Sequence, residues 1–263
     1  MSPAQPTGSS ERSITVRARL PYLSAQKIRV RVRGEGEPLL LINGMTRPLQ
    51  SWDQLTRLLP GRTVISFDAP GVGGSPTPVV PLSITELATL AAEVLDAAGV
   101  PDADILGYSH GGAIAQELAI NAPDRVRALI LAATSCGVGA TPGSRRDILG
   151  SLGRSLDGQP WPLPDPLGLL WQSLAVSNWT SIPFLGAISA PTLVVCGSRD
   201  RIVPPANSRV LAGRIPDATL LILDGKGHNL QRQDTATLLA PVVDRFLRAG
   251  TATLRLRACG LPA

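Results

Sequence analysis

The chain carries two different patterns of apolar and polar positions, and their order predicts a sheet covered by helices. Residues 13–20 and 26–33 alternate apolar and polar side chains, which is the period of antiparallel strands with one face in water. Short, mostly apolar runs follow and predict strands that are buried on both faces. These runs lie at residues 39–42, 63–67, 103–106, 126–133, 191–196 and 219–223.

Helical patterns separate these runs. The clearest is residues 83–98, where Ser83 and Glu86 form a capping-box signature and Gly99 is a helix stop. Other helices are predicted at residues 51–59, 112–120, 204–213 and 234–248. Strands that alternate with helices predict an α/β fold, with a mostly parallel, twisted sheet and helices on both of its faces.

One segment interrupts the alternation. Residues 137–188 are rich in Gly, Pro, Trp and Leu and contain only short helical pieces, at 145–152 and 166–175. We interpret this segment as a short lid inserted into the fold. The predicted organisation is a flexible tail, a core in two parts, the lid and a C-terminal tail, at residues 1–12, 13–136 with 189–248, 137–188 and 249–263.

Composition narrows the classes of function. The net charge is +5, but the arginines are scattered and aromatic residues make up only 3% of the chain, so we expect no nucleic-acid partner. The chain has three cysteines, a small and odd number that does not fit a disulfide framework. We find no secretory signal and no apolar run of the roughly 20 residues that a membrane span needs. The sequence therefore predicts a cytoplasmic protein and does not determine its oligomeric state.

The candidate chemistry starts at Gly107-Tyr108-Ser109-His110-Gly111, between a predicted strand and a predicted helix. A G-x-S-x-G sequence in this context places a serine on a sharp turn, with its hydroxyl above the sheet. Gly107 and Gly111 would let the strand and helix backbones approach closely. The bare motif also fits an ordinary glycine-rich turn, so its neighbours in the fold must decide.

Two further side chains follow later strands, in the order expected of a catalytic triad. Asp200 comes after the strand at 191–196, and His228 after the strand at 219–223. The carboxyl ends of parallel strands meet at one edge, so Ser109, Asp200 and His228 are predicted to converge there as nucleophile, carboxylate and base. The only other histidine, His110, is expected to point away from the hydroxyl. The alternatives are a loop role for His228 and a helix-capping role for Asp200.

The remaining site residues are predicted from the same edge of the sheet. The backbone N–H groups of Met45 and His110 are expected to form the oxyanion hole. The glycine-rich loop 68–75 lacks the lysine of a P-loop, so Asp68 is expected to bind the N–H groups of that loop.

Several segments carry a more specific resemblance. They are Leu40-Leu41-Ile42-Asn43-Gly44, residues 67–75, 131–134, 171–172, 178–182 and 209–216. On these segments the chain resembles the α/β-hydrolase family and, within it, the intracellular medium-chain poly(3-hydroxyalkanoate) depolymerases. His110 departs from that branch, which has Trp at this position, and the lid is shorter.

The resemblance implies a serine hydrolase that cleaves carboxylic esters through an acyl-enzyme. Its substrate would be a small-molecule or polymeric ester, such as a medium-chain hydroxyalkanoate, and neither a metal nor an organic cofactor would be needed. Trp171 and Trp179 in the lid would then either line an apolar acyl site or form ordinary lid core. The same residues would also serve a hydrolase of thioesters, lactones or C–C bonds, or a cofactor-free perhydrolase. A ligand-binding protein without turnover is the alternative from another class.

Overall fold

A computed structural model describes residues 11–18, 26–151 and 165–258. Its centre is an eight-stranded sheet in the order β1-β2-β4-β3-β5-β6-β7-β8. The strands β1 and β2 run antiparallel to their neighbours, and the other six are parallel, as the sequence predicts. The strands are β1 (Glu11–Ala18), β2 (Gln26–Arg33), β3 (Glu37–Ile42), β4 (Arg62–Phe67), β5 (Ala103–Tyr108), β6 (Val126–Ala132), β7 (Thr192–Gly197) and β8 (Ala218–Leu223).

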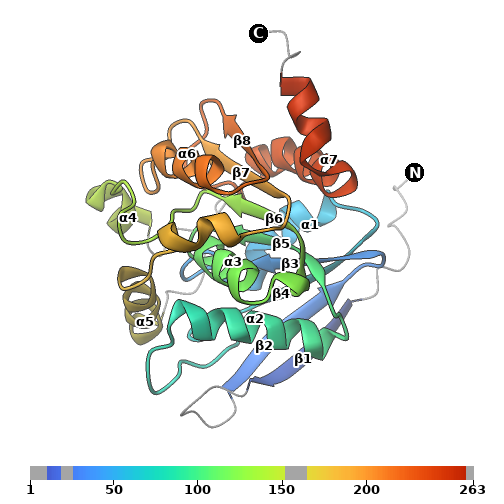
Figure 1. The fold of residues 1–263 in the computed structure, drawn as a ribbon. Coiled ribbons are helices and arrows are strands. Elements are labelled where there is room, and N and C mark those ends of the chain that lie inside the picture. The colour runs from blue at the N-terminus through green and yellow to red at the C-terminus, as the bar shows by residue number, and fades with distance from the viewer. Residues whose placement is uncertain (1–10, 19–25, 152–164, 259–263) are drawn as a thin grey trace, which may run out of the picture.

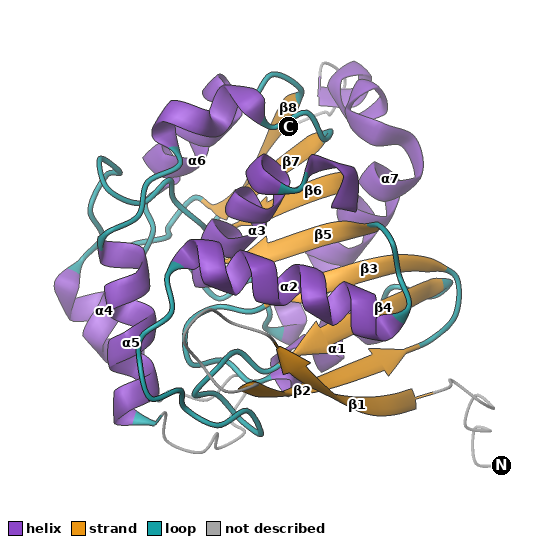
Figure 2. Ribbon diagram, turned by 60° about the horizontal axis from the view of Figure 1, so that its bottom comes forward, coloured by secondary structure: helices purple, strands orange, loops and turns teal. Residues whose placement is uncertain are grey.

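Helices cover both faces of this sheet (Figures 1 and 2). They are α1 (Asp53–Arg57), α2 (Ile84–Ala98), α3 (His110–Asn121), α4 (Arg145–Ser151), α5 (Pro166–Ser177), α6 (Pro205–Arg214) and α7 (Gln233–Ala258). Short 3-10 turns lie at η1 (Leu49–Trp52), η2 (Pro123–Arg125) and η3 (Ile182–Ala187). The Ser83–Glu86 capping box and the left-handed Gly99 delimit α2 as the sequence predicts.

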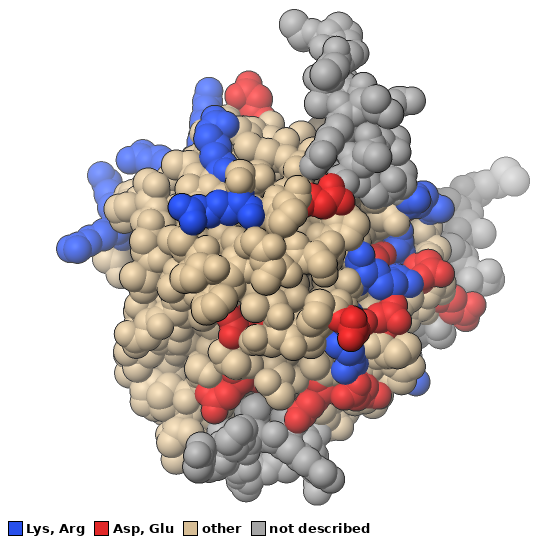
Figure 3. All heavy atoms as spheres, in the orientation of Figure 1, with Lys and Arg blue, Asp and Glu red and all other residues tan. Residues whose placement is uncertain are grey.

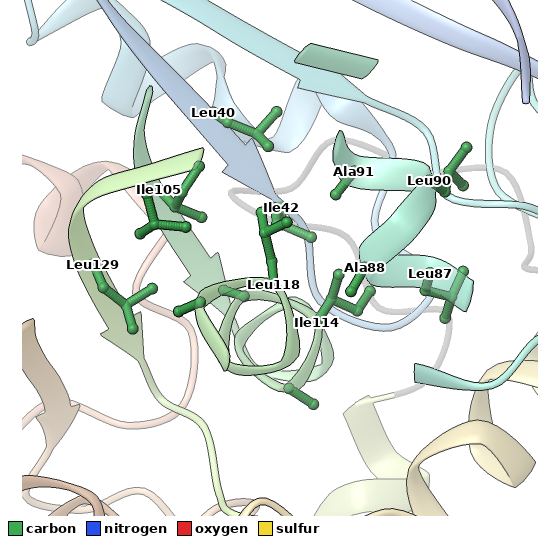
Figure 4. Close-up of a cluster of buried hydrophobic side chains, with 14 of the residues drawn as sticks. Leu40, Ile42, Leu87, Ala88, Leu90, Ala91, Ile105, Ile114, Leu118 and Leu129 are labelled. Atoms are coloured by element: carbon green, nitrogen blue, oxygen red, sulfur yellow. The ribbon is translucent and has the colours of Figure 1, made fainter. Parts of the chain in front are cut away.

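The pleat of the inner strands divides the core into two layers. Leu40 and Ile42 of β3 point to one face, where they pack with α2 and α3 (Figure 4). Leu39 and Leu41 point to the other face, where α1 and α7 cover them. Because both faces are apolar, the run 39–42 has no polar position, in contrast to the alternating β2.

The connection between β6 and β7 contains α4, α5 and η3, and residues 137–188, interpreted from the sequence as a lid, lie within it. Residues 152–164, which include the end of the first predicted helical piece, lie outside the described part of the chain. Within the described ranges, no helix combines the length and the apolar character needed to cross a bilayer.

Three predicted boundaries are wrong. The strand β1 begins at Glu11, inside the predicted tail 1–12. The helix predicted over 51–59 is a 3-10 turn followed by the short α1. The helix α7 continues to Ala258, although a tail was predicted from residue 249. Gly250 costs a helix only about 1 kcal/mol, and the Leu- and Arg-rich residues after it favour a helix.

Candidate active site

Ser109 occupies the turn between β5 and α3 in a strained backbone conformation. Its φ is 53° and its ψ is −117°, a region that side-chain-bearing residues rarely adopt. Two hydrogen bonds hold it there: the Ser109 N–H donates to the Ala132 carbonyl at 2.9 Å, and the Thr134 hydroxyl donates to the Ser109 carbonyl at 2.7 Å. The end of β6 therefore fixes the conformation of the turn.

Close approach of backbones explains the glycines beside Ser109. A Cβ on Gly107 would lie 2.4 Å from the carbonyl oxygen of Gly111. A Cβ on Gly111 would lie 2.2 Å from the carbonyl oxygen of Ile42. No side chain fits at these distances, so the turn requires glycine at both positions, as the sequence predicts.

The structure brings Ser109, His228 and Asp200 into one hydrogen-bonded chain. The distance from His228 Nε2 to Ser109 Oγ is 3.0 Å, and that from His228 Nδ1 to Asp200 Oδ2 is 2.8 Å. An ionised carboxylate only accepts hydrogen bonds, so Asp200 favours the tautomer with the proton on Nδ1. This leaves the Nε2 lone pair facing the serine hydroxyl, as a general base requires.

Asp200 lies at the loop that follows β7, and its side chain is fully buried. Its other oxygen, Oδ1, accepts hydrogen bonds from the N–H groups of Ile202 and Val203, at 2.9 and 2.8 Å. The carboxylate thus bonds the turn before α6 as well as the imidazole. The capping role that the sequence left open is combined here with the contact to His228.

Tyr108 contacts His228 through both its hydroxyl and its ring, and this contact was not predicted from the sequence. Its hydroxyl donates to the His228 carbonyl at 3.0 Å, and its ring centroid lies 5.4 Å from that of the imidazole. Burial raises the pKa of Tyr108, which remains a neutral hydrogen-bond donor. The position is visible in the sequence, directly before Ser109, but only the fold shows that it reaches the loop of His228.

Ser109 and His228 open into a cavity of about 1190 Å³. Met45 and His110 line the same cavity, where their backbone N–H groups are the expected oxyanion donors. His110 is the first residue of α3, so its N–H has no acceptor in a preceding helical turn. The Met45 loop is anchored to α5, because the Thr46 N–H donates to Gln172 Oε1 at 2.9 Å.

The His110 side chain is buried and does not bond the serine hydroxyl. Only 5% of the residue is exposed, and its Nε2 has no hydrogen-bond partner among the described residues. Burial lowers the pKa of His110 to about 4, although a hydrogen bond to the Gln172 backbone acts in the opposite direction. The imidazole is therefore neutral at physiological pH, next to the candidate nucleophile.

Trp171 and Trp179 do not line the described cavity. The prediction that these two lid residues form the apolar wall of an acyl site is therefore wrong for this cavity. The Trp171 indole donates to the Pro78 carbonyl at 3.1 Å, and the Trp179 indole donates to Glu117 Oε2 at 2.8 Å. A buried indole N–H needs a partner, and both partners lie away from the cavity. Trp179 is 8% exposed and belongs to the hydrophobic core, as the alternative interpretation states.

The glycine-rich loop after β4 is organised by Asp68, as predicted. Its Oδ2 accepts the N–H of Gly74 at 2.8 Å, and its Oδ1 accepts the N–H of Leu49 at 2.7 Å. Asp68 is fully buried and lies 3.4 Å from the Arg29 guanidinium. Among the described residues, no His, Cys, Asp or Glu side chains are grouped as metal ligands would be.

Comparisons with known proteins agree with this geometry. The profile of the alpha/beta hydrolase fold family matches residues 37–152 and 154–235. The chain is 36% identical over 258 residues to the poly(3-hydroxyalkanoate) depolymerase of Ectopseudomonas oleovorans, covering 86% of this chain and 90% of the relative. It is 34% identical over 256 residues to the 2-hydroxymuconate semialdehyde hydrolase of Pseudomonas putida, covering 82% and 88%.

A solved structure shows the same architecture. The crystal structure of a hydrolase from Pseudomonas aeruginosa PA01 aligns with a TM-score of 0.78 and 26% identity, covering 90% of this chain and 98% of that one. The fold, the turn at Ser109 and the sequence relatives agree, and the protein belongs to the α/β-hydrolase family.

Proposed function

We propose that the protein hydrolyses carboxylic esters through an acyl-enzyme formed on Ser109. The observation that carries the proposal is the hydrogen-bonded chain from Ser109 through His228 to Asp200, which opens into a large cavity. A serine hydroxyl is a weak nucleophile at neutral pH, and a base within hydrogen-bond reach makes it reactive. A binding protein without turnover would not require that base.

In the first half-reaction, Ser109 Oγ attacks the ester carbonyl while His228 Nε2 takes the hydroxyl proton. The carbonyl oxygen becomes an oxyanion, which the N–H groups of Met45 and His110 would stabilise. The buried Asp200 carboxylate stabilises the imidazolium that forms. His228 then donates the proton to the leaving alkoxide, and the alcohol departs.

In the second half-reaction, water takes the place of the alcohol. His228 accepts a proton from the water, the resulting hydroxide adds to the acyl carbonyl, and the oxyanion forms again at the same donors. Collapse of this intermediate breaks the bond to Ser109 Oγ, and His228 returns the proton to the serine. The two steps use only the triad, the backbone donors and water.

The substrate class that the relatives favour is an ester of a hydroxyalkanoic acid, small or polymeric. Similarity to the Ectopseudomonas oleovorans depolymerase supports this class, because it extends over most of both chains. C–C bond hydrolysis is the second candidate, since the Pseudomonas putida relative is named for a semialdehyde substrate rather than an ester. Thioesters, lactones and perhydrolysis would use the same triad.

The test is hydrolysis of p-nitrophenyl esters from acetate to dodecanoate, together with 3-hydroxyoctanoate oligomers. Ser109→Ala should reduce kcat by a factor on the order of 10⁶, because a triad acts as a unit. Ser83→Ala is the matched control: it removes the cap of α2, lies outside the cavity lining and should keep full activity while losing about 1 kcal/mol of stability.

Turnover by Ser109→Ala at the wild-type rate would refute the proposal. Turnover of a diketone panel, without turnover of any ester or lactone, would favour the second candidate function. No turnover of any substrate would favour a binding role.

A further inference from the structure

The cavity beside Ser109 is cationic, and it differs in this respect from the apolar acyl site expected from the sequence. Among the described residues, six guanidinium or ammonium groups line it, against two carboxylates, those of Asp147 and Asp234. The cationic residues are Arg47, Arg146, Arg199, Arg201, Lys226 and Arg232. The buried carboxylate of Asp200, which bonds His228, is not part of this lining, and the positive groups outnumber the carboxylates even when it is counted.

The carboxylates of the wall pair with only some of these cations. Arg201 lies 3.2 Å from Asp147, and Lys226 and Arg232 lie 2.8 and 3.5 Å from Asp234. Arg146 and Arg199 are exposed, and neither lies within salt-bridge distance of a carboxylate in the described part of the chain. A solvated cation on a cavity wall is available to a ligand, whereas a paired one must first give up its partner.

The two exposed arginines belong to elements that touch. Arg146 is in α4 and Arg199 is in the loop after β7. The Ser144 N–H, at the start of α4, donates to the Arg201 carbonyl at 2.7 Å, and Arg201 pairs with Asp147 of the same helix. Figure 3 shows basic side chains gathered over the part of the surface where α4 and α6 lie in Figure 1.

Arg47 adds a positive charge closer to the chemistry. It follows Met45 in the loop after β3 and lies near Tyr108, which directly precedes Ser109. Burial lowers the pKa of Arg47, a sign that water solvates this guanidinium incompletely, yet arginine stays charged at neutral pH. A partly desolvated charge acts more strongly on a ligand than one in bulk water.

Given the proposed esterase function, we propose that the cationic wall of this cavity binds a free carboxylate of the substrate. The preferred ester would then carry an acid group in addition to the scissile bond, as a hydroxyalkanoate oligomer does at its chain end. Apolar side chains in the same wall, including Ile148, Val176 and Ile202, would contact the alkyl part. The cavity thus fits an amphiphilic ester, with Arg146 and Arg199 as specificity-determining residues.

The test compares esters that differ only in this charge. One pair is the linear dimer of 3-hydroxyoctanoic acid and its methyl ester, with the charge on the alcohol part. The other pair is mono-p-nitrophenyl octanedioate and p-nitrophenyl octanoate, with the charge on the acyl part. In at least one of the two pairs, we expect kcat/KM at low salt to be at least about 10-fold higher for the acid than for the neutral ester. This advantage of the acid should fall as ionic strength rises.

The variant Arg146→Gln/Arg199→Gln should lose most of this advantage, which is measured within each protein as the ratio of kcat/KM for the acid to kcat/KM for the neutral ester. The matched control is Arg209→Gln/Arg245→Gln, which removes the same charge from exposed arginines outside the cavity lining and should keep the advantage. Equal turnover of acids and neutral esters, or an advantage that survives in the first variant, would overturn the inference and leave the esterase proposal intact.

If no ester is hydrolysed, the esterase proposal fails and binding decides the inference. Calorimetry on Ser109→Ala with octanedioate and with dimethyl octanedioate measures carboxylate binding without turnover. The cationic subsite is supported if octanedioate binds more strongly than dimethyl octanedioate and this difference is lost when both arginines are replaced by glutamine. Equal or absent binding of the two compounds overturns it.

Discussion

The buried imidazole of His110 makes the stability of this protein sensitive to mild acid. In the folded chain, burial holds the pKa of His110 at about 4, so the ring stays neutral until the pH is very low. In the unfolded chain the same ring is solvated and takes up a proton near its ordinary pKa of about 6.5. Between these two values the unfolded state binds more protons, and stability therefore falls as the pH falls.

The size of this effect follows from the pKa difference. Each pH unit within the window from about 6.5 to about 4 costs about 1.4 kcal/mol of folding free energy. Lowering the pH from 7 to 5 crosses about 1.5 units of that window and should remove about 2 kcal/mol. Among the described residues, His110 Nε2 has no hydrogen-bond partner that would stabilise the charged ring. A loss of this size is a large part of the stability of an ordinary domain.

The assay is urea unfolding at pH 7 and pH 5 for the wild type, His110→Phe and His110→Gln. Other groups titrate in the same interval, so the informative quantity is the pH-dependent loss in wild type minus that in each variant. Both variants lack the titrating ring, one apolar and one polar, and both should lose about 2 kcal/mol less than wild type. Equal losses in all three proteins would refute the reasoning.

Three further predictions concern the site and its support. Tyr108→Phe removes the hydroxyl that holds the His228 carbonyl, and kcat on p-nitrophenyl octanoate should fall by up to about 10-fold with KM unchanged; an unaltered kcat would argue against a positioning role. Asp104→Asn leaves the buried Arg62 without its charged partner at 2.6 Å and should cost about 3–5 kcal/mol in urea unfolding, whereas a cost below about 1 kcal/mol would contradict this. Gly107→Ala places a Cβ 2.4 Å from a backbone carbonyl oxygen and should give little folded protein by circular dichroism; normal expression with wild-type activity would contradict the close approach.

The convergence of the proposed triad residues could be predicted because it depends on topology. Ser109, Asp200 and His228 each follow a strand, and parallel strands bring their carboxyl ends to one edge whatever the details of packing. The glycines at 107 and 111 were predictable for a similar reason, since a sharp strand-to-helix turn leaves no space for a Cβ. Such features follow from the order of the elements.

The character of the cavity could not be predicted, because it depends on which way the side chains of the insertion point. Trp171 and Trp179 are directed away from the cavity by the acceptors that their N–H groups find, the Pro78 carbonyl and the Glu117 carboxylate. Both acceptors lie far from the tryptophans in the sequence. Without the fold, the composition of the insertion indicates an apolar lining, whereas arginines from α4 and from separate loops occupy the wall.

Backbone strain in this protein is concentrated at the proposed site. In the described part of the chain, the residues other than glycine with positive φ are Thr46, Ser109 and Ala133, at 61°, 53° and 49°. They follow β3, β5 and β6, three strands that lie side by side at the centre of the sheet. Each such conformation costs on the order of 1–3 kcal/mol and persists only where surrounding contacts enforce it.

The contacts that enforce this strain also connect the three turns. The Ser109 N–H bonds the carbonyl that precedes Ala133, the Ala133 N–H donates to the Val195 carbonyl at 2.7 Å, and the Thr46 N–H is held by Gln172. The packing of the apolar layers on both faces of the sheet stabilises the fold and offsets the free-energy cost of these strained conformations. A substitution that relaxes one turn should therefore stabilise the fold and disturb the alignment of Ser109 with the proposed oxyanion donors, so that stability and activity change in opposite directions.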